Sequence, residues 1–276
     1  MLDQFVYENH LGRRFVGLEK GVYLNYSELR DYEWSYDTIN DKISRFYHSI
    51  TNRKLPLWVH CKSKAEAISV KNSLFDLTEV DIEAKIPGKI YIGDFYTRGY
   101  ITSSAKSNYL VKDNFCQIDL VLTSDDPAWY KEQTRSFMAG SGEATETGKG
   151  ADYPYDYSYD YAVSASGEKI ICDSIGNSAF KLLIYGPATD PAVIVNDHVY
   201  KVNAMIGSQE TLLIDSVAKT ITLTTSTGSK INYFDKRDRE NYIFEPIPPG
   251  QNAISKIGNF GFDLTVVEKR SEPRWI

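Results

Sequence analysis

Short apolar segments separated by turn residues recur at close intervals between residues 190 and 252. The segments are Ala192–Val195, Val199–Met205, Thr211–Ile214 and Thr220–Thr225. In the last of them, Ile221 and Leu223 alternate with threonines, and this period of two is typical of half-buried antiparallel strands. Asx-containing turns between such segments predict hairpins, and several hairpins in a row predict a sandwich or barrel. Three further strands are expected at Ile170–Cys172, Phe180–Tyr185 and Phe260–Val267.

The first half of the chain combines strands with a helix at about residues 63–77. Ser63 followed by Glu66 is a capping-box pattern, in which each side chain accepts a hydrogen bond from a free backbone N–H. An apolar stripe at helical spacing follows, formed by Ala67, Val70, Leu74 and Leu77. Such a stripe requires a sheet to pack against.

Strands are expected on both sides of this helix, at Gly21–Leu24, Lys54–Cys61, Val80–Lys85, Lys89–Ile92, Tyr96–Ser103 and Phe115–Thr123. Between residues 39 and 50, apolar positions lie close to helical spacing, which favours a second helix. One strand, a helix and then mostly strands predict an α+β domain or a helix-decorated sandwich. The whole chain is therefore expected to be mainly β with a minor helix.

The character of the sequence changes from residue 137 to residue 151, where Gly, Ser and Thr dominate and no apolar period is visible. Such composition is typical of a flexible linker. We therefore expect an N-terminal domain at 1–136, a linker at 137–151 and a C-terminal β-sandwich at 152–276.

Composition narrows the range of functions. The 276 residues include 31 Lys and Arg against 37 Asp and Glu, a formal net charge of −6. This balance argues against a protein that neutralises phosphates or binds anionic lipid, but it is compatible with a channel through which DNA passes. The three cysteines, Cys61, Cys116 and Cys172, lie far apart and are expected to be buried free thiols. No secretory signal or apolar span of about 20 residues is visible, so we expect a soluble protein made in the cytosol.

The sequence offers little for catalysis. Its histidines, His10, His48, His60 and His198, lack metal-ligand spacing, and no phosphate-binding or nucleophile-elbow motif occurs. Asp235, Asp238 and Glu240 are the acids closest to a glycosidase pair. Their loop also carries basic residues, which favours a solvated connection or a subunit contact. We therefore predict no enzyme activity, no cofactor and no metal.

Two features favour binding surfaces. Tyrosine occupies every second position in one stretch, at Tyr153, Tyr155, Tyr157, Tyr159 and Tyr161. An extended chain would place all five on one face, either as a sugar-stacking or partner-binding surface or as the cover of a sandwich core. Trp275, near two arginines, is either an interface anchor or part of a frayed terminus.

Several segments, in order and spacing, resemble phage distal tail proteins, the hub proteins of siphophage tail tips. They are Gly88–Ile92, Asp126–Tyr130, Asp190–Asn196, Leu213–Asp215, Asn232–Phe234, Tyr242–Phe244, Ile247–Asn252 and Arg270–Trp275. The resemblance covers most of the chain beyond about Pro87. It implies an N-terminal domain that forms a hexameric ring and a C-terminal galectin-like sandwich, with the last residues packing back on the first domain.

The resemblance also implies a function. Such a ring is a structural component at the distal end of the virion tail, assembled in the bacterial host cytoplasm. It joins the tail tube to tail-tip and receptor-binding proteins, while DNA only passes through its channel. One alternative is a carbohydrate-binding module that recognises host surface glycans. A galectin-like fold does not itself bring sugar binding, so this alternative requires an exposed aromatic platform with polar groups beside it. Another is a cell-wall hydrolase, which would require two facing carboxylates in a cleft.

Overall fold

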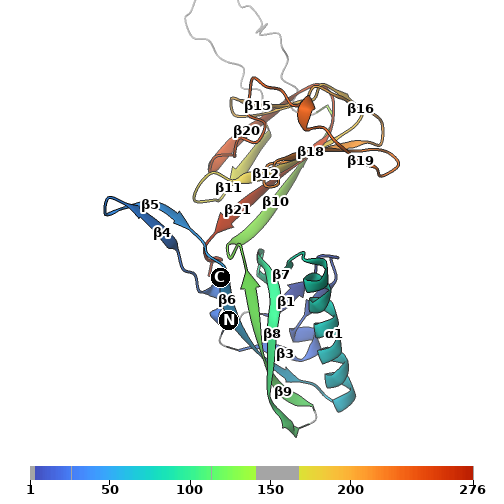
Figure 1. The fold of residues 1–276 in the computed structure, drawn as a ribbon. Coiled ribbons are helices and arrows are strands. Elements are labelled where there is room, and N and C mark those ends of the chain that lie inside the picture. The colour runs from blue at the N-terminus through green and yellow to red at the C-terminus, as the bar shows by residue number, and fades with distance from the viewer. Residues whose placement is uncertain (1–3, 26, 113, 141–167, 276) are drawn as a thin grey trace, which may run out of the picture. The chain divides into compact units, whose positions relative to one another are not determined.

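The computed structural model describes residues 4–25, 27–112, 114–140 and 168–275 (Figure 1). These residues form two compact units. The first contains the described residues up to Lys131 together with those from Lys269 onward, and the second runs from Glu132 to Glu268. The boundary between the two units lies within strand β10 (Trp129–Phe137), which begins in the first unit and ends in the second. This boundary comes before the linker expected at 137–151.

The first unit consists of short and long strands, one α-helix among the described residues, and two 3-10 turns. In chain order the elements are β1 (Val6–Glu8), β2 (Arg14–Val16), η1 (Leu18–Lys20), β3 (Val22–Leu24), η2 (Glu28–Arg30), β4 (Ser35–Ile39), β5 (Lys42–Tyr47), β6 (Thr51–His60), α1 (Lys64–Ala84), β7 (Gly88–Ile92), β8 (Phe95–Lys112) and β9 (Phe115–Ser124).

Strand β8 organises this unit, because its two halves pair with different neighbours. Phe95–Gly99 pairs with β7, and the continuation from Tyr100 pairs with β9. The strand order is consequently β2-β1-β7-β8 on one side and β8-β9-β6-β3 on the other. A contiguous apolar core lies within the unit and includes Phe5, Phe15, Leu57, Leu120 and Trp129.

Helix α1 begins as predicted and ends later than predicted. The Oγ of Ser63 accepts a hydrogen bond from the backbone N of Glu66 at 3.2 Å, and the Glu66 carboxylate accepts from the backbone N of Lys62 at 2.9 Å. The helix continues to Ala84, so the strand expected at Val80–Lys85 is wrong. The buried face of the helix continues beyond the apolar stripe through Thr78 and Asp81, which are polar but keep the helical spacing.

The helix expected at residues 39–50 is also wrong, because this segment forms a β-hairpin. Strands β4 and β5 pair antiparallel, with Tyr36 opposite Phe46. Asn40 and Asp41 form the two-residue connection, and both have a positive φ, 49° and 60°. Two successive left-handed residues are typical of a type I′ hairpin turn, which Asn and Asp tolerate well.

The second unit receives the end of β10 and continues through strands and one further 3-10 turn. The elements are β11 (Glu168–Cys172), β12 (Ala179–Tyr185), β13 (Ala188–Thr189), β14 (Ala192–Val195), β15 (His198–Lys201), β16 (Met205–Ile206), β17 (Thr211–Asp215), β18 (Thr220–Thr224), β19 (Lys230–Asn232), η3 (Phe234–Lys236), β20 (Gly250–Ile257) and β21 (Phe262–Arg270).

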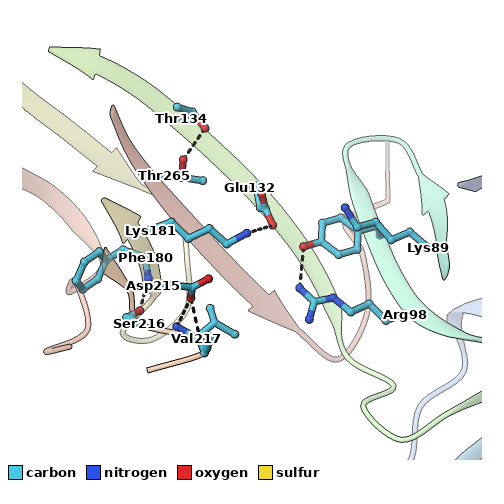
Figure 2. A network of polar contacts seen from close by, with 12 residues as sticks. Lys89, Arg98, Glu132, Thr134, Phe180, Lys181, Asp215, Ser216, Val217 and Thr265 are labelled. Carbon is cyan, nitrogen blue, oxygen red and sulfur yellow. Dashed lines mark hydrogen bonds and ion pairs between the residues drawn. The ribbon is translucent and has the colours of Figure 1, made fainter. Parts of the chain in front are cut away.

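Two larger sheets and the short strand pair β13-β16 form this unit around one core. One has the strand order β19-β18-β17-β12-β21-β10 and the other the order β11-β20-β14-β15. Inward residues from both sheets, such as Leu182, Val193 and Leu264, belong to the same apolar cluster. Figure 2 shows the polar outer face of the first sheet, where Lys181 of β12 reaches Glu132 of β10 at 3.1 Å and Thr134 contacts Thr265 at 2.8 Å. The predicted β-sandwich is thus present, whereas its galectin-like character stays a prediction.

Two details of the second unit differ from the expected strands. The segment Val199–Met205 is divided between β15 and β16. Strands β13, β19 and β20 are additional, and the inward positions of β20 include buried Asn252 and Lys256. The Lys256 ammonium donates to the Phe260 carbonyl at 2.7 Å, and the Asn252 amide donates to the Pro248 carbonyl at 3.0 Å. Both side chains are therefore buried with satisfied hydrogen bonds.

Candidate functional site

The hairpin of β4 and β5 carries an exposed aromatic face. Register places Tyr36 beside Phe46 and Thr38 beside Ile43, on the side that Trp34 also occupies. The Phe46 ring meets the rings of Trp34 and Tyr36 edge to face, at centroid distances of 6.3 and 6.5 Å. Tyr36 and Phe46 are each 58% exposed, and Ile43 is 52% exposed. We call Trp34, Tyr36, Ile43 and Phe46 the aromatic face.

The opposite face of the hairpin is charged. Asp37 lies opposite Arg45, and Lys42 follows the turn. The guanidinium of Arg45 lies 5.6 Å from the centroid of the Tyr47 ring. Ile39, which lies opposite Lys42 and is 65% exposed, shares this face with the charged residues, whereas the aromatic face carries no charged residue.

Within the described part of the chain, β4 and β5 pair only with each other. Figure 1 shows the hairpin projecting from the rest of the first unit. An isolated two-stranded hairpin is marginally stable in water, and a contiguous exposed apolar patch on a soluble protein typically marks an interaction site. The aromatic face therefore has the properties of a surface that another molecule covers.

A buried polar cluster joins the end of α1 to the N-terminal strands. The fully buried carboxylate of Asp81 accepts hydrogen bonds from the Tyr7 phenol and from the backbone N of His10, the latter at 2.9 Å. The Nδ1 of His10 lies 2.5 Å from the same carboxylate. Burial, followed by the hydrogen bond and charge of Asp81, raises the pKa of Tyr7 far above its ordinary value. These contacts satisfy the carboxylate, and we interpret the cluster as an anchor for the helix.

The C-terminal segment is held by an arginine of the first unit. The Arg30 guanidinium lies 4.0 Å from the centroid of the Trp275 ring, and its Nη1 donates to the Pro273 carbonyl at 3.2 Å. The Trp275 side chain is nevertheless 74% exposed. A role as an interface anchor, one of the two alternatives given above, stays a prediction.

The second unit contains an open cleft of about 500 Å³. The β14–β15 turn contributes Asn196, Asp197 and His198 to its lining, and a loop of the same unit contributes Glu245. The His198 Nε2 lies 2.9 Å from the Tyr242 carbonyl, which fixes the imidazole. From the sequence, His198 was only one of four scattered histidines without metal-ligand spacing, and the fold places it in this cleft.

The remaining predicted candidates are not brought together. The tyrosines from Tyr153 to Tyr161 lie outside the described residues. Asp235 and Glu240 are exposed and do not line the cleft, and Asp238 accepts from Asn241 at 3.4 Å. Across the described residues, no group of three or more His, Cys, Asp or Glu is arranged to hold a metal ion.

The three cysteines are free and buried, as predicted. Burial raises the pKa of each of the three thiols above its ordinary value. Buried thiols of raised pKa are inert at neutral pH, because the thiolate is the reactive form. In the part of the chain that the structure describes, no helix has the length and apolar character that a bilayer crossing requires.

The chain is mostly β and forms two units. The described part of the first unit contains one α-helix, and the second unit is a β-sandwich, and these features define the fold class. No family model matches the sequence, and no curated protein matches it. Solved structures do match along nearly the whole chain. The Dit protein of phage SPP1, described as a paradigm of the hub adsorption apparatus in phages infecting Gram-positive bacteria, is 12% identical, with 96% of this chain and 99% of that chain covered and a TM-score of 0.56.

A chain of the phage P2 baseplate in its activated conformation with Ca is 14% identical, and the corresponding chain with Sr is 13% identical. Each comparison covers 99% of this chain and 100% of the other, with a TM-score of 0.60. The chain therefore has the fold of phage distal tail and baseplate hub proteins. The resemblance stated from the sequence is confirmed at the level of the fold.

Proposed function

We propose that this protein is a structural component of a phage tail tip, a hub that assembles from several copies of the chain. The aromatic face of the hairpin carries the proposal, because a second copy of the chain would remove it from water. Burying apolar surface contributes about 25 cal/mol per Å², so several large side chains per contact supply a substantial driving force. The fold likeness to hub and baseplate proteins supports the same function.

Within this proposal, six copies close into a ring that joins the tail tube to tail-tip and receptor-binding proteins. The ring belongs to the virion, is assembled in the host cytoplasm and lets DNA pass through its channel. The net charge of −6 per chain supports passage without binding, provided that acidic residues face the channel. The function lies in surfaces, without enzymatic turnover or a cofactor.

Sedimentation velocity of the full chain tests the proposed assembly. The wild type is expected to sediment as a species six times the 31.3 kDa of one chain. Replacing Tyr36 and Phe46 with Ser should weaken the association at least about tenfold, because apolar burial at the contact is lost.

A matched control replaces Leu11 and Leu18, which are 58% and 57% exposed elsewhere in the first unit, with Ser. This control should assemble like the wild type. A wild type that stays monomeric at every concentration would contradict assembly through self-association. Equal weakening by both variants would contradict the role of the hairpin.

A further inference from the structure

A second exposed aromatic patch lies on the outer face of strands β3, β6 and β9 in the first unit. Along β6 alternate residues are buried in the core, and Trp58 points the other way. Tyr23 of β3 lies directly opposite Trp58, and each of the two is 44% exposed. On β9, Gln117 lies opposite Trp58, and Phe115 meets His60 edge to face with ring centroids 6.2 Å apart. We call Tyr23, Trp58, His60, Phe115 and Gln117 the Trp58 face.

The proposed ring requires a surface that receives the aromatic face of the hairpin. A contact in which one patch meets the same patch of a second copy is isologous and produces a two-fold dimer. Six copies related by rotation are instead joined by heterologous contacts, in which two different patches meet. The aromatic face of the hairpin supplies one patch, so its counterpart must lie elsewhere on the chain.

The Trp58 face matches the aromatic face in chemistry. Energetically dominant interface residues are enriched in Trp and Tyr and tend to pair with such residues on the partner. None of the residues that define the two faces is a Lys, Arg, Asp or Glu, so their contact buries no fixed charge. The edges differ in sign, because Lys54 points outward on β6 and the exposed Glu33 adjoins Trp34. The two surfaces are therefore complementary at the centre and at the rim.

The exposed area of the two faces is also sufficient to matter. Five of their side chains, Trp34, Tyr36, Phe46, Tyr23 and Trp58, are between 43% and 58% exposed. Burying one aromatic side chain completely removes about 150–250 Å² from water, so about 500 Å² remains to be buried on the five together. A standard contact buries about 1,600 Å², of which a little over half is apolar. These five side chains thus supply roughly half of the apolar area of a stable contact.

We propose that the Trp58 face of one copy receives the aromatic face of the hairpin of the next copy. This inference rests on the proposed hub and names the surface that its contact uses. Each copy then gives its hairpin to one neighbour and offers its Trp58 face to the other, which is a heterologous arrangement.

Sedimentation velocity of variants of the full chain tests this assignment. Tyr23→Thr with Trp58→Thr removes both rings but keeps residues suited to strands, and should weaken association at least about tenfold. Gln117→Lys places a charge beside Trp58 without removing an apolar side chain, and should also weaken association. A matched control, Ile68→Ser with Ile82→Ser, removes side chains of α1 that are 45% and 41% exposed, and should assemble like the wild type. Circular dichroism verifies that all variants are folded.

Mixing two defective variants separates a heterologous contact from an isologous one. The variant with Ser at positions 36 and 46 keeps its Trp58 face, and the variant with Thr at positions 23 and 58 keeps its hairpin. Each alone should remain monomeric at about 0.1 mM, whereas an equimolar mixture should form a species of two chains, twice 31.3 kDa, through its one intact contact. A contact between two hairpins would instead let the second variant associate alone.

The inference is overturned if the variant with Thr at positions 23 and 58 assembles like the wild type. It is equally overturned if the mixture of folded variants contains no two-chain species. A wild type that stays monomeric contradicts the proposed hub and this inference together. A wild type whose assembly is weakened by the hairpin variant and not by the Trp58-face variants contradicts this inference alone, so the two failures are distinguishable.

Discussion

At the scale of single residues, the first unit depends on a few buried polar groups. Asp81 is fully buried at the end of α1 and is hydrogen-bonded to Tyr7 and His10, which lie more than 70 positions away in the sequence. Removing one partner from a buried polar group costs more than the hydrogen bond contributes, because the remaining group is left without water. The carboxylate therefore fixes the helix end against β1 only while its partners stay in place.

Gly88 is the residue whose replacement tests this cluster most directly. A Cβ at this position would come closer than 3.0 Å to both the Tyr7 hydroxyl and the Asp81 carboxylate. Neither group can move without breaking a buried hydrogen bond, so Gly88→Ala should destabilise the first unit by about 1–3 kcal/mol. Urea unfolding followed by tryptophan fluorescence measures this loss, because Trp34, Trp58, Trp129 and Trp275 all belong to the first unit.

Gly176→Ala is the matched control for Gly88→Ala. A Cβ at Gly176 meets no atom within 4 Å. Because Gly176 lies in the second unit, which holds no tryptophan, its effect on stability is followed by circular dichroism and should stay within about 0.5 kcal/mol. A Gly88→Ala protein as stable as this control would show that the buried cluster tolerates an added methyl group, contrary to the packing described above.

At the scale of elements, the sequence predicted well those segments whose buried face is apolar. In β18, Ile221 and Leu223 are buried where the alternation with threonine placed them. The start of α1 followed equally from its cap and stripe. Prediction failed where polar residues occupy the buried face, as with Asp81 in the last turns of α1 and Asn252 in β20. Hydrophobic periodicity cannot detect such positions, since their burial depends on partners distant in sequence.

The candidate surfaces were less predictable than the elements. Between residues 39 and 50 the apolar positions are compatible with a helix. The Asn40-Asp41 pair, whose two residues adopt left-handed backbone conformations, is the feature that favours a hairpin instead. An aromatic residue that faces water in an isolated hairpin has the same sequence signature as one that faces a core. The cleft was not predictable, because its lining comes from the turn at Asn196 and the loop at Glu245, nearly 50 residues apart.

The N-terminal cap of α1 gives a prediction at this scale. Ser63→Ala removes the oxygen that accepts from the backbone N of Glu66 and should cost about 1 kcal/mol in the stability of the first unit. Ser69→Ala, at an exposed interior position of the same helix, is the matched control and should be neutral or slightly stabilising. Fluorescence-detected urea unfolding compares the two. Equal stability of both variants would be inconsistent with a contribution from the cap.

At the scale of the whole molecule, two forces act on the proposed assembly in opposite directions. The aromatic face of the hairpin favours association, whereas a net charge of −6 on every copy opposes it. Repulsion between like-charged copies is long-ranged and depends on ionic strength, while apolar burial depends on it little. The balance can therefore be measured by varying the salt concentration alone.

Association should strengthen as sodium chloride is raised from about 0.1 M to about 1 M, because the Debye length falls from about 10 Å to about 3 Å and screens the repulsion. We expect the dissociation constant from sedimentation to fall several-fold. The variant with Ser at positions 36 and 46 should remain weakly associated at both concentrations, since screening cannot replace the missing apolar contact. If salt instead dissociates the wild-type assembly, ion pairs between copies hold it together, and the charged face of the hairpin becomes the contact to test.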